Sequence, residues 1–274
     1  MKSIGWKNHN WLKIDDIFIS IRDRGLKFSD GIFETILIRE NKAILLKEHL
    51  NRLKRTAKIL NIDFQLDEKF IVKIIKDGIK SLSLSNKEYG SIRINYSRGL
   101  NLERSIKISK ENNKFNIENL WIEFHLIQLN FDSMSVIISK NERRNEFSLI
   151  SNCKTFSYSQ SIQALIEATN KNYDDSLLLN TKNELCCGTT FNLLLRRDNK
   201  WFTPNRDSGC LPGIMIDKLL KLNFVYEEKI LPEFQTDDVL IAINSLSCRK
   251  IIKVDNLTLS SDFDPKFFWE LLYN

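Results

Sequence analysis

Two kinds of hydrophobic pattern alternate along the chain, and this alternation limits the possible folds more than any other feature. Apolar side chains recur at helical spacing in residues 47–60 and 68–82, whereas residues 90–99 and 120–127 alternate with the period of two that a strand requires. Strand and helix patterns continue in mixed order to the C-terminus. The sequence therefore predicts an α/β or α+β fold with mixed sheets.

The hydrophobic pattern pauses at residues 128–132, where we expect a linker between two domains. The N-terminal α/β domain would then span residues 1–127, and a C-terminal α/β domain would span residues 133–274. The other predicted elements are strands at 31–39, 135–139, 176–179, 239–243 and 251–254, a hairpin at 191–202, helices at 158–170, 213–222 and 265–273, a turn at Asn41-Lys42, and surface loops at 101–117 and 143–151.

The composition is typical of a soluble globular protein, with 42% hydrophobic and 28% charged residues, and the odd number of cysteines without a secretory signal indicates the cytoplasm. No run approaches the roughly 18 apolar residues of a membrane span. No apolar segment follows Lys2, as a secretory signal would require. The five cysteines are an odd number, which indicates reduced thiols, and they form no C-x-x-C pair. We therefore expect neither a disulfide framework nor a metal site.

A small anionic ligand explains the charge pattern as well as a polyanion does. The net charge of +6 is modest for 274 residues, and the lysines are scattered along the chain. No motif of a nucleic-acid-binding module, such as an RNP strand or a paired zinc finger, is present. A basic nucleic-acid-binding domain is therefore the weaker alternative, together with a ligand-binding protein without catalysis.

Lys154 is the first candidate for a reactive residue. It stands in the run S-N-C-K-T-F-S-Y-S from Ser151 to Ser159, among small and apolar neighbours. Burial and nearby positive charge lower the pKa of a lysine, which makes its amine available as a nucleophile. Ser151 and Lys154 also match the S-x-x-K of serine acyl enzymes, but the S-D-N and K-T-G elements that this class requires are missing.

Two further features indicate contacts with an anion. Gly213 opens a predicted helix, whose first N–H groups and dipole favour negative charge. In the strand at 90–99, Tyr96 and Arg98 share one face with two isoleucines. An arginine that ends an apolar face is out of place unless an anion lies there, so we expect Arg98, with Tyr96, to hold a substrate carboxylate.

Several motifs in a fixed order connect these features to a known family. They are D-R-G and D-G-I-F-E-T between Asp23 and Thr35, H-L-N-R-L at His49 to Leu53, Lys154, Asn192, and L-P-G-I-M at Leu211 to Met215. With these motifs the chain resembles the class IV aminotransferases, the fold-type IV pyridoxal-phosphate enzymes, and is most similar to the aminodeoxychorismate lyases among them. The resemblance implies two α/β domains of the D-amino acid aminotransferase type, a cofactor in the cleft between them, and a homodimer.

The resemblance also implies which residues bind the cofactor. Lys154 would form the Schiff base with pyridoxal 5'-phosphate, and Arg52 would contact its phosphate. The expected cofactor-binding set is Arg52, Lys154, Cys187, Gly188, Thr189, Thr190, Leu211, Gly213, Ile214, Met215, Asn244 and Ser245. Tyr158 would contact the substrate together with Tyr96 and Arg98.

Two positions depart from the family pattern. Cys187, five residues before Asn192, stands where the family has a glutamate that pairs with the pyridine nitrogen. Glu184 lies three residues earlier and should point to the opposite face of a regular strand. Ser29 stands where a glycine is usual before Asp30. A carboxylate keeps the ring nitrogen protonated and makes the cofactor a strong electron sink, so a thiol in its place favours a lyase over a transaminase.

The reaction implied by the resemblance converts 4-amino-4-deoxychorismate to 4-aminobenzoate and pyruvate, a step of folate synthesis. A lyase that makes its product aromatic depends less on a strong electron sink than a transaminase does. The alternative within the family is a branched-chain or D-amino acid aminotransferase, because these enzymes share the fold and differ in their substrate loops.

Overall fold

The computed structural model describes residues 2–110, 114–260 and 262–273, and it divides into two compact units. The first unit contains Met1–Leu129 together with Cys153–Ser157, and the second contains Asn130–Asn152 and Tyr158–Asn274. The chain thus changes units after Leu129, within the expected linker region. The sequence pattern carries no sign that five residues around Lys154 belong to the first unit.

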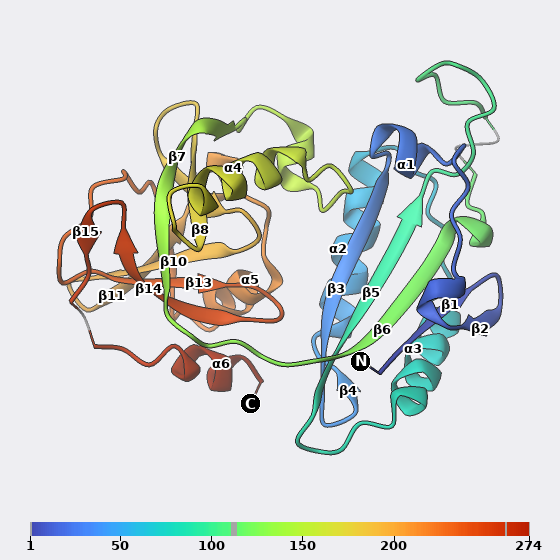
Figure 1. The fold of residues 1–274 in the computed structure, drawn as a ribbon, viewed down its shortest axis with the longest axis horizontal. Coiled ribbons are helices and arrows are strands. Elements are labelled where there is room, and N and C mark those ends of the chain that lie inside the picture. Colours follow the sequence, from blue (N-terminus) through green and yellow to red (C-terminus); the bar gives the residue numbers. More distant parts are fainter. Residues whose placement is uncertain (1, 111–113, 261, 274) are drawn as a thin grey trace. The chain divides into compact units, whose positions relative to one another are not determined.

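The first unit is built on a six-stranded antiparallel sheet in the order β2-β1-β6-β5-β3-β4. Its strands are β1 (Ser3–Lys7), β2 (Asn10–Leu12), β3 (Gly31–Arg39), β4 (Lys42–Ala43), β5 (Tyr89–Ser97) and β6 (Leu120–Ile127). Its helices are the short α1 (Arg24–Phe28), α2 (Leu46–Ile59) and α3 (Glu68–Leu82), with 3-10 turns at Ile14–Asp16 and Ile117–Asn119. In Figure 1, β3, β5 and β6 run side by side, and α2 packs on β3 while α3 packs on β1 and β6.

The two faces of this sheet differ in composition. One face carries Ile36, Ile92 and Phe124, which are fully buried against the apolar sides of α2 and α3. The strand register places Phe33 and Asn95 opposite each other on the other face, together with Arg93. The alternating pattern therefore separates a hydrophobic core from a polar and aromatic face, as a half-buried sheet requires.

Residues 153–157 lie along the start of β3. The Phe33 N–H donates to the carbonyl of Lys154 at 3.1 Å, and the Phe156 N–H donates to the carbonyl of Gly31 at 3.0 Å. The short β4 pairs only with the far end of β3, at Ile38 and Arg39. Backbone pairing thus brings Lys154 beside the residues that begin β3.

The second unit is built on a mixed nine-stranded sheet in the order β12-β11-β10-β13-β14-β7-β8-β9, with β15 paired to β14. Its strands are β7 (Met134–Arg144), β8 (Asp175–Asn180), β9 (Leu185–Gly188), β10 (Asn192–Arg197), β11 (Lys200–Pro204), β12 (Tyr226–Glu228), β13 (Val239–Ile243), β14 (Cys248–Val254) and β15 (Leu257–Thr258). Its helices are α4 (Ser159–Thr169), α5 (Ile214–Lys221) and α6 (Lys266–Tyr273), with 3-10 turns at Leu149–Asn152 and Arg206–Ser208. The β7–β8, β7–β14 and β11–β12 pairs are parallel and the others are antiparallel, which confirms the prediction of mixed sheets.

Two local predictions were wrong. The strand predicted at 135–139 continues as β7 to Arg144, because a bulge lets Arg143 pair with Leu179. The turn predicted at Asn41-Lys42 is centred one residue earlier, where Glu40 and Asn41 both adopt positive φ. In the loop predicted at 101–117, residues 111–113 lie outside the described part, and the described remainder holds no α-helix or strand.

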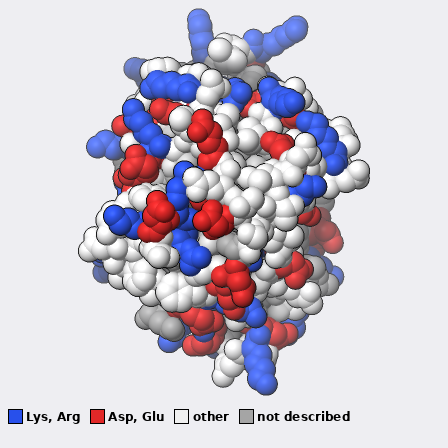
Figure 2. Space-filling model, turned by 90° about the vertical axis from the view of Figure 1, so that its left-hand side faces the viewer, with Lys and Arg blue, Asp and Glu red and all other residues white. Residues whose placement is uncertain are grey.

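Figure 2 shows one face of the molecule, on which basic and acidic side chains are interspersed. Among the described residues on that face, the basic side chains form no continuous stripe. The helices of the described ranges include none with the length and apolar character to cross a membrane.

Candidate active site

Lys154 lies in a position that changes the chemistry of its amine. Its Nζ lies 4.2 Å from the centroid of the Phe33 ring. Burial lowers the pKa of Lys154, and the charge of Arg52 lowers it further, whereas Glu34 raises it; the result is a pKa of about 8. Much more of the amine is therefore neutral near neutral pH than in an ordinary lysine, and the neutral form is the one that acts as a nucleophile or a general base.

A buried ion cluster stands next to this lysine. Glu34, on the helix-covered face of β3, is fully buried and accepts two hydrogen bonds of 2.7 Å from Arg52 Nε and Nη2. Its Oε2 also lies 2.7 Å from His49 Nδ1. His49 and Arg52 are three residues apart on α2, so one face of the helix presents both to Glu34. The bidentate pairing fixes the orientation of the guanidinium.

The protonation states of the cluster follow from this geometry. Burial raises the pKa of Glu34, but the charge and hydrogen bonds of Arg52 and the bond to His49 outweigh it and lower that pKa to about 2. Burial lowers the pKa of His49 despite its bond to Glu34. His49 is thus a neutral ring that donates to a carboxylate. The phosphate contact predicted for Arg52 stays a prediction.

The polar and aromatic face of the same sheet carries a residue that our sequence analysis missed. The guanidinium carbon of Arg93 lies 3.8 Å from the centroid of Phe33, the same ring that Lys154 contacts. Arg93 Nε donates to Asn95 at 2.8 Å, and Asn95 donates to Glu123 at 2.9 Å. The available signal in the sequence was the alternation of β5, which separates Arg93 from the apolar face. In the structure Arg93 pairs with Thr35 of β3.

Arg98, the predicted carboxylate ligand, lies on the helix-covered face. Its Nε donates to Asp30 at 3.0 Å, and its terminal nitrogens donate to the carbonyls of Asn61 and Leu60 at 3.0 and 2.8 Å. Only 4% of Arg98 is exposed. An arginine at the end of an apolar face is thus accounted for by Asp30 and by backbone carbonyls. Its predicted contact with the substrate stays a prediction.

Tyr96 lies beside Arg98 on this face and is packed into the core. Its ring stacks on Phe115 and meets the edge of Phe64. Its hydroxyl accepts a 3.2 Å hydrogen bond from the Asn116 N–H. Tyr96 therefore has a structural environment within the first unit, and its predicted substrate contact is untested.

In the second unit, the start of α5 has the features of an anion site. Gly213 is the N-cap of this eight-residue helix, and no side chain caps its first N–H groups. A Cβ at Gly213 would lie 2.0 Å from Asn192 Oδ1, so any other residue would displace the Asn192 side chain. Asn192 in turn donates to the carbonyl of Leu211 at 3.0 Å. The N–H groups of Ile214 and the residue after it are thus available to the phosphate of a cofactor.

The other predicted cofactor residues of the second unit gather around two turns. The backbone N–H and the hydroxyl of Thr189 donate to Asp175 at 3.3 and 3.0 Å. Asn244 Nδ2 donates to the carbonyl of Thr190 at 3.3 Å, which ties the turn after β13 to the turn after β9. Gly188 is the last residue of β9, Ser245 lies in the turn after β13, and Tyr158 is the residue before α4.

Cys187 lies in a buried cluster of thiols. A register shift in the β8–β9 pair sets Cys187 opposite Leu178 and Leu185 opposite Leu179. Cys186 is the extra residue of this bulge, and both thiols enter one buried cluster with Cys210. A hydrogen bond from Cys186 lowers the pKa of the Cys187 thiol, which burial alone would raise. Glu184 accepts a 2.8 Å bond from Asn180 in the turn between these strands.

The residues of the two units fit pyridoxal 5'-phosphate when each unit is considered by itself. The first unit supplies an amine with a lowered pKa and a fixed guanidinium. The second supplies an uncapped helix start where a Cβ would not fit. Within the described ranges no group of three or more histidine, cysteine, aspartate or glutamate side chains could hold a metal ion.

The motif order and this geometry agree with a comparison to known proteins. A family model described as amino-transferase class IV matches residues 31–255. The chain belongs to the class IV aminotransferase family. This membership confirms the recognition made from the sequence and the cofactor expected from it, pyridoxal 5'-phosphate.

Relatives within the family carry the names of both expected activities. A Methanocaldococcus jannaschii protein named after the branched-chain amino acid aminotransferases is 26% identical over 217 residues, which are 78% of this chain and 73% of the relative. The aminodeoxychorismate lyase of Bacillus subtilis is 23% identical over 209 residues, 76% of this chain and 69% of the relative.

A solved structure shows the same fold at low identity. An aminotransferase from Brucella abortus, bound to pyridoxal phosphate, matches with a TM-score of 0.83 and 17% identity over 99% of both chains. The expected fold-type IV architecture is thereby confirmed.

Proposed function

We propose that the protein is a pyridoxal-phosphate-dependent lyase that converts 4-amino-4-deoxychorismate to 4-aminobenzoate and pyruvate. The observation that carries this proposal is Cys187, a thiol within a thiol cluster at the position of the family glutamate. The Bacillus subtilis relative, named as such a lyase, supports the same reading.

The cofactor, when bound, supplies an electron sink for the bond broken next to the substrate amine. A carboxylate beside the ring nitrogen strengthens that sink, whereas the Cys187 thiol strengthens it only weakly. Loss of pyruvate makes the ring of this substrate aromatic, and that gain drives the reaction. The lyase therefore tolerates Cys187, while transamination would lose more from the exchange.

Each of the other residues has a proposed task. Lys154 attaches the cofactor and later removes the proton from the ring carbon that bears the substrate amine; its pKa of about 8 suits both steps. Glu34 holds Arg52 in one orientation. Gly213 and the N–H groups that follow it hold the phosphate.

The second candidate is an aminotransferase for branched-chain or D-amino acids. The Methanocaldococcus jannaschii relative favours it. Arg93 suits both candidates, because a guanidinium on the ring that Lys154 contacts can bind a carboxylate of either substrate. A reaction test must therefore distinguish the two.

The visible absorption spectrum distinguishes the two reactions. The purified protein is mixed with 4-amino-4-deoxychorismate and, separately, with D- and L-amino acids. We expect the cofactor band to persist over many turnovers while 4-aminobenzoate accumulates. If an amino acid instead converts the band to that of the amine form, and a 2-oxo acid restores it, the protein is an aminotransferase and the lyase proposal fails.

A substitution tests the role assigned to Cys187. We expect Cys187→Glu, once shown to fold, to retain lyase turnover within a few-fold and to gain transamination. Cys187→Ser is the matched control, because it has nearly the same size and no carboxylate. A collapse of lyase activity in both variants would assign the thiol a direct part in the reaction.

Four further expectations remain proposals: a homodimer, a place in folate synthesis, a cytoplasmic location, and a cofactor bound in the cleft between the domains. Light scattering of the purified protein with and without cofactor tests the first of these. A mass that corresponds to one chain under both conditions would contradict it.

A further inference from the structure

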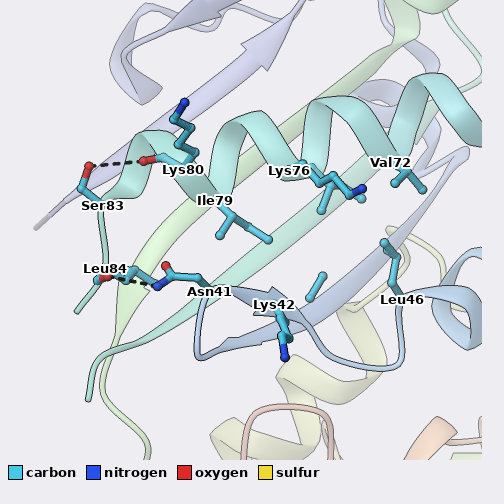
Figure 3. A pocket seen from close by; sticks show the side chains of 11 residues that line it. Asn41, Lys42, Leu46, Val72, Lys76, Ile79, Lys80, Ser83 and Leu84 are labelled. Carbon is cyan, nitrogen blue, oxygen red and sulfur yellow. Dashed lines mark hydrogen bonds between the residues drawn. The ribbon is translucent and has the colours of Figure 1, made fainter. Parts of the chain in front are cut away.

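The first unit contains a cavity that the proposed reaction does not use. It has a volume of about 620 Å³ and opens between α3 and the segment that leads from the β3–β4 turn into α2. Its apolar lining consists of Ala43, Leu46, Val72, Ile75, Ile79 and Leu84. Figure 3 shows Val72 and Ile79 on the underside of α3, with Leu46 pointing toward them from the opposite side. This volume is within the range of small-molecule sites, roughly 300–1,000 Å³.

The charged residues that line the cavity all carry the same sign. Lys42, Lys76 and Lys80 contribute to the lining, and no acidic side chain does so among the described residues. All three lysines are exposed. In Figure 3 the ammonium groups of Lys42 and Lys80 extend away from the space on opposite sides. A lysine side chain is long and flexible, so each amine can turn toward an anion at the mouth without leaving water.

We propose that this cavity binds a small amphipathic carboxylate with one anionic head and an apolar chain. The apolar lining favours methylene groups, which gain free energy when they leave water. The three lysines favour an anionic head over a neutral or a cationic one. A polyanion would lack apolar groups for the lining, and a neutral hydrocarbon would leave the lysines unused.

A series of ligands tests both halves of the proposal. Butanoate, hexanoate and octanoate are titrated into the holoenzyme, and binding is followed by calorimetry and by chemical-shift changes at the amides of α3. We expect each added methylene to tighten binding roughly three- to fourfold while the chain lies within the cavity. Octanol should bind at least several-fold more weakly than octanoate. Absence of binding by octanoate, or equal binding of octanol, would overturn the proposal.

Substitutions identify the site. The triple variant Lys42→Ala, Lys76→Ala, Lys80→Ala should weaken octanoate binding about tenfold, because the head loses three nearby charges. A control with the same change in net charge replaces Lys58, Lys69 and Lys73, exposed lysines of α2 and α3 that do not line the cavity. Equal weakening in both triple variants would mean that net charge alone acts, and would contradict a site at this cavity.

A second variant tests the apolar half without removing charge. Val72→Trp reduces the open volume while all three lysines remain, and we expect it to abolish the gain from hexanoate to octanoate. Thermal melting first establishes that the variant folds. Exchange protection of the α3 amides that rises with protein concentration, in the absence of carboxylate, would assign the cavity to a second copy of the chain and overturn the proposal.

Discussion

The two units supply the predicted cofactor residues by different physical means. In the first, Lys154, Glu34 and Arg52 are charged or titratable side chains that set one another's protonation and orientation. In the second, the helix that begins after Gly213 offers backbone N–H groups. Gly213 has no side chain that would displace Asn192 at this helix start. We therefore expect the first unit to be sensitive to charge and pH, and the second to volume.

The largest effect should come from Lys154→Ala. The holoenzyme treated with borohydride should carry the cofactor covalently at residue 154, and this variant should carry none. Mass spectrometry of the digested protein measures the attachment, with the exposed Lys73→Ala as the control. Cofactor found attached to another lysine of the wild-type chain would remove Lys154 from its central role.

Glu34→Gln should have the next largest effect, a loss of about 3 kcal/mol in the free energy of unfolding. The substitution leaves the buried guanidinium of Arg52 without a carboxylate, and breaking such a pair is costly. Urea denaturation at pH 7 measures the loss, with the exposed Glu103→Gln as the control. A change below about 1 kcal/mol would mean that the cluster does not hold the first unit together.

Glu34→Gln should also make the free energy of unfolding less dependent on pH in the acidic range. The pKa of Glu34 is about 2 in the folded chain, below its ordinary value of 4.5. A carboxylate with a lowered folded pKa stabilises the fold above about pH 4.5, and this stabilisation is lost as the pH falls toward 2. Denaturation between pH 6 and pH 3 should therefore have a shallower slope in Glu34→Gln than in the wild type. Identical slopes would contradict the assigned cause.

The reactivity of the Lys154 amine gives a fourth prediction for the first unit. In cofactor-free protein, modification of Lys154 by an amine-reactive reagent should rise through about pH 8, well below the 10.5 of an ordinary lysine. Glu34 raises this pKa, so Glu34→Gln should move the rise to lower pH. Peptide mapping of the labelled protein measures the extent of modification at Lys154 at each pH. A rise near pH 10 would mean that the surroundings of Lys154 do not depress its pKa.

The second unit should respond to volume at Gly213. Gly213→Ala should cost about 1–3 kcal/mol and weaken the retention of cofactor, because its Cβ would meet Asn192 Oδ1. The double variant Gly213→Ala, Asn192→Ala removes the contact, so its loss should be smaller than the sum of the single losses. Additive losses would show that Asn192 is not the obstacle.

The smallest effect tests a backbone feature within the charge-rich unit. Ser29 ends α1 with φ of 56°, a conformation that glycine adopts more easily than serine. Ser29→Gly should therefore stabilise the protein by about 0.5 kcal/mol, and Ser29→Ala should not. Thermal denaturation measures both, and equal effects of the two substitutions would exclude the conformational explanation.

Much of the fold was predictable, because hydrophobic period is a local property of strands and helices. The predicted bounds of β3, β6, β13 and α3 agree with the structure. The two wrong local predictions concern a bulge and a two-residue turn, where a single residue shifts the pairing. A pattern averaged over several residues does not locate such a shift.

The candidate site was predictable in part, through motifs that stand in order along the chain. The sequence analysis chose Arg98 and missed Arg93. The alternating pattern of β5 distinguishes the two faces of the strand, but it does not show which residues of other elements contact each face. Asp30 and two backbone carbonyls account for Arg98. The thiol cluster was also beyond prediction, since a bulge places Cys186 and Cys187 together where regular alternation would separate them.

The sequence by itself determined the mixed α/β class, the family and its cofactor, because these depend on residue types at fixed spacing. Only the tertiary structure decided that Lys154 pairs with the start of β3 and that Glu34 binds Arg52 and His49. It also decided the pKa of about 8 at Lys154. Burial and charge act through space, between residues that the chain brings together only when it folds.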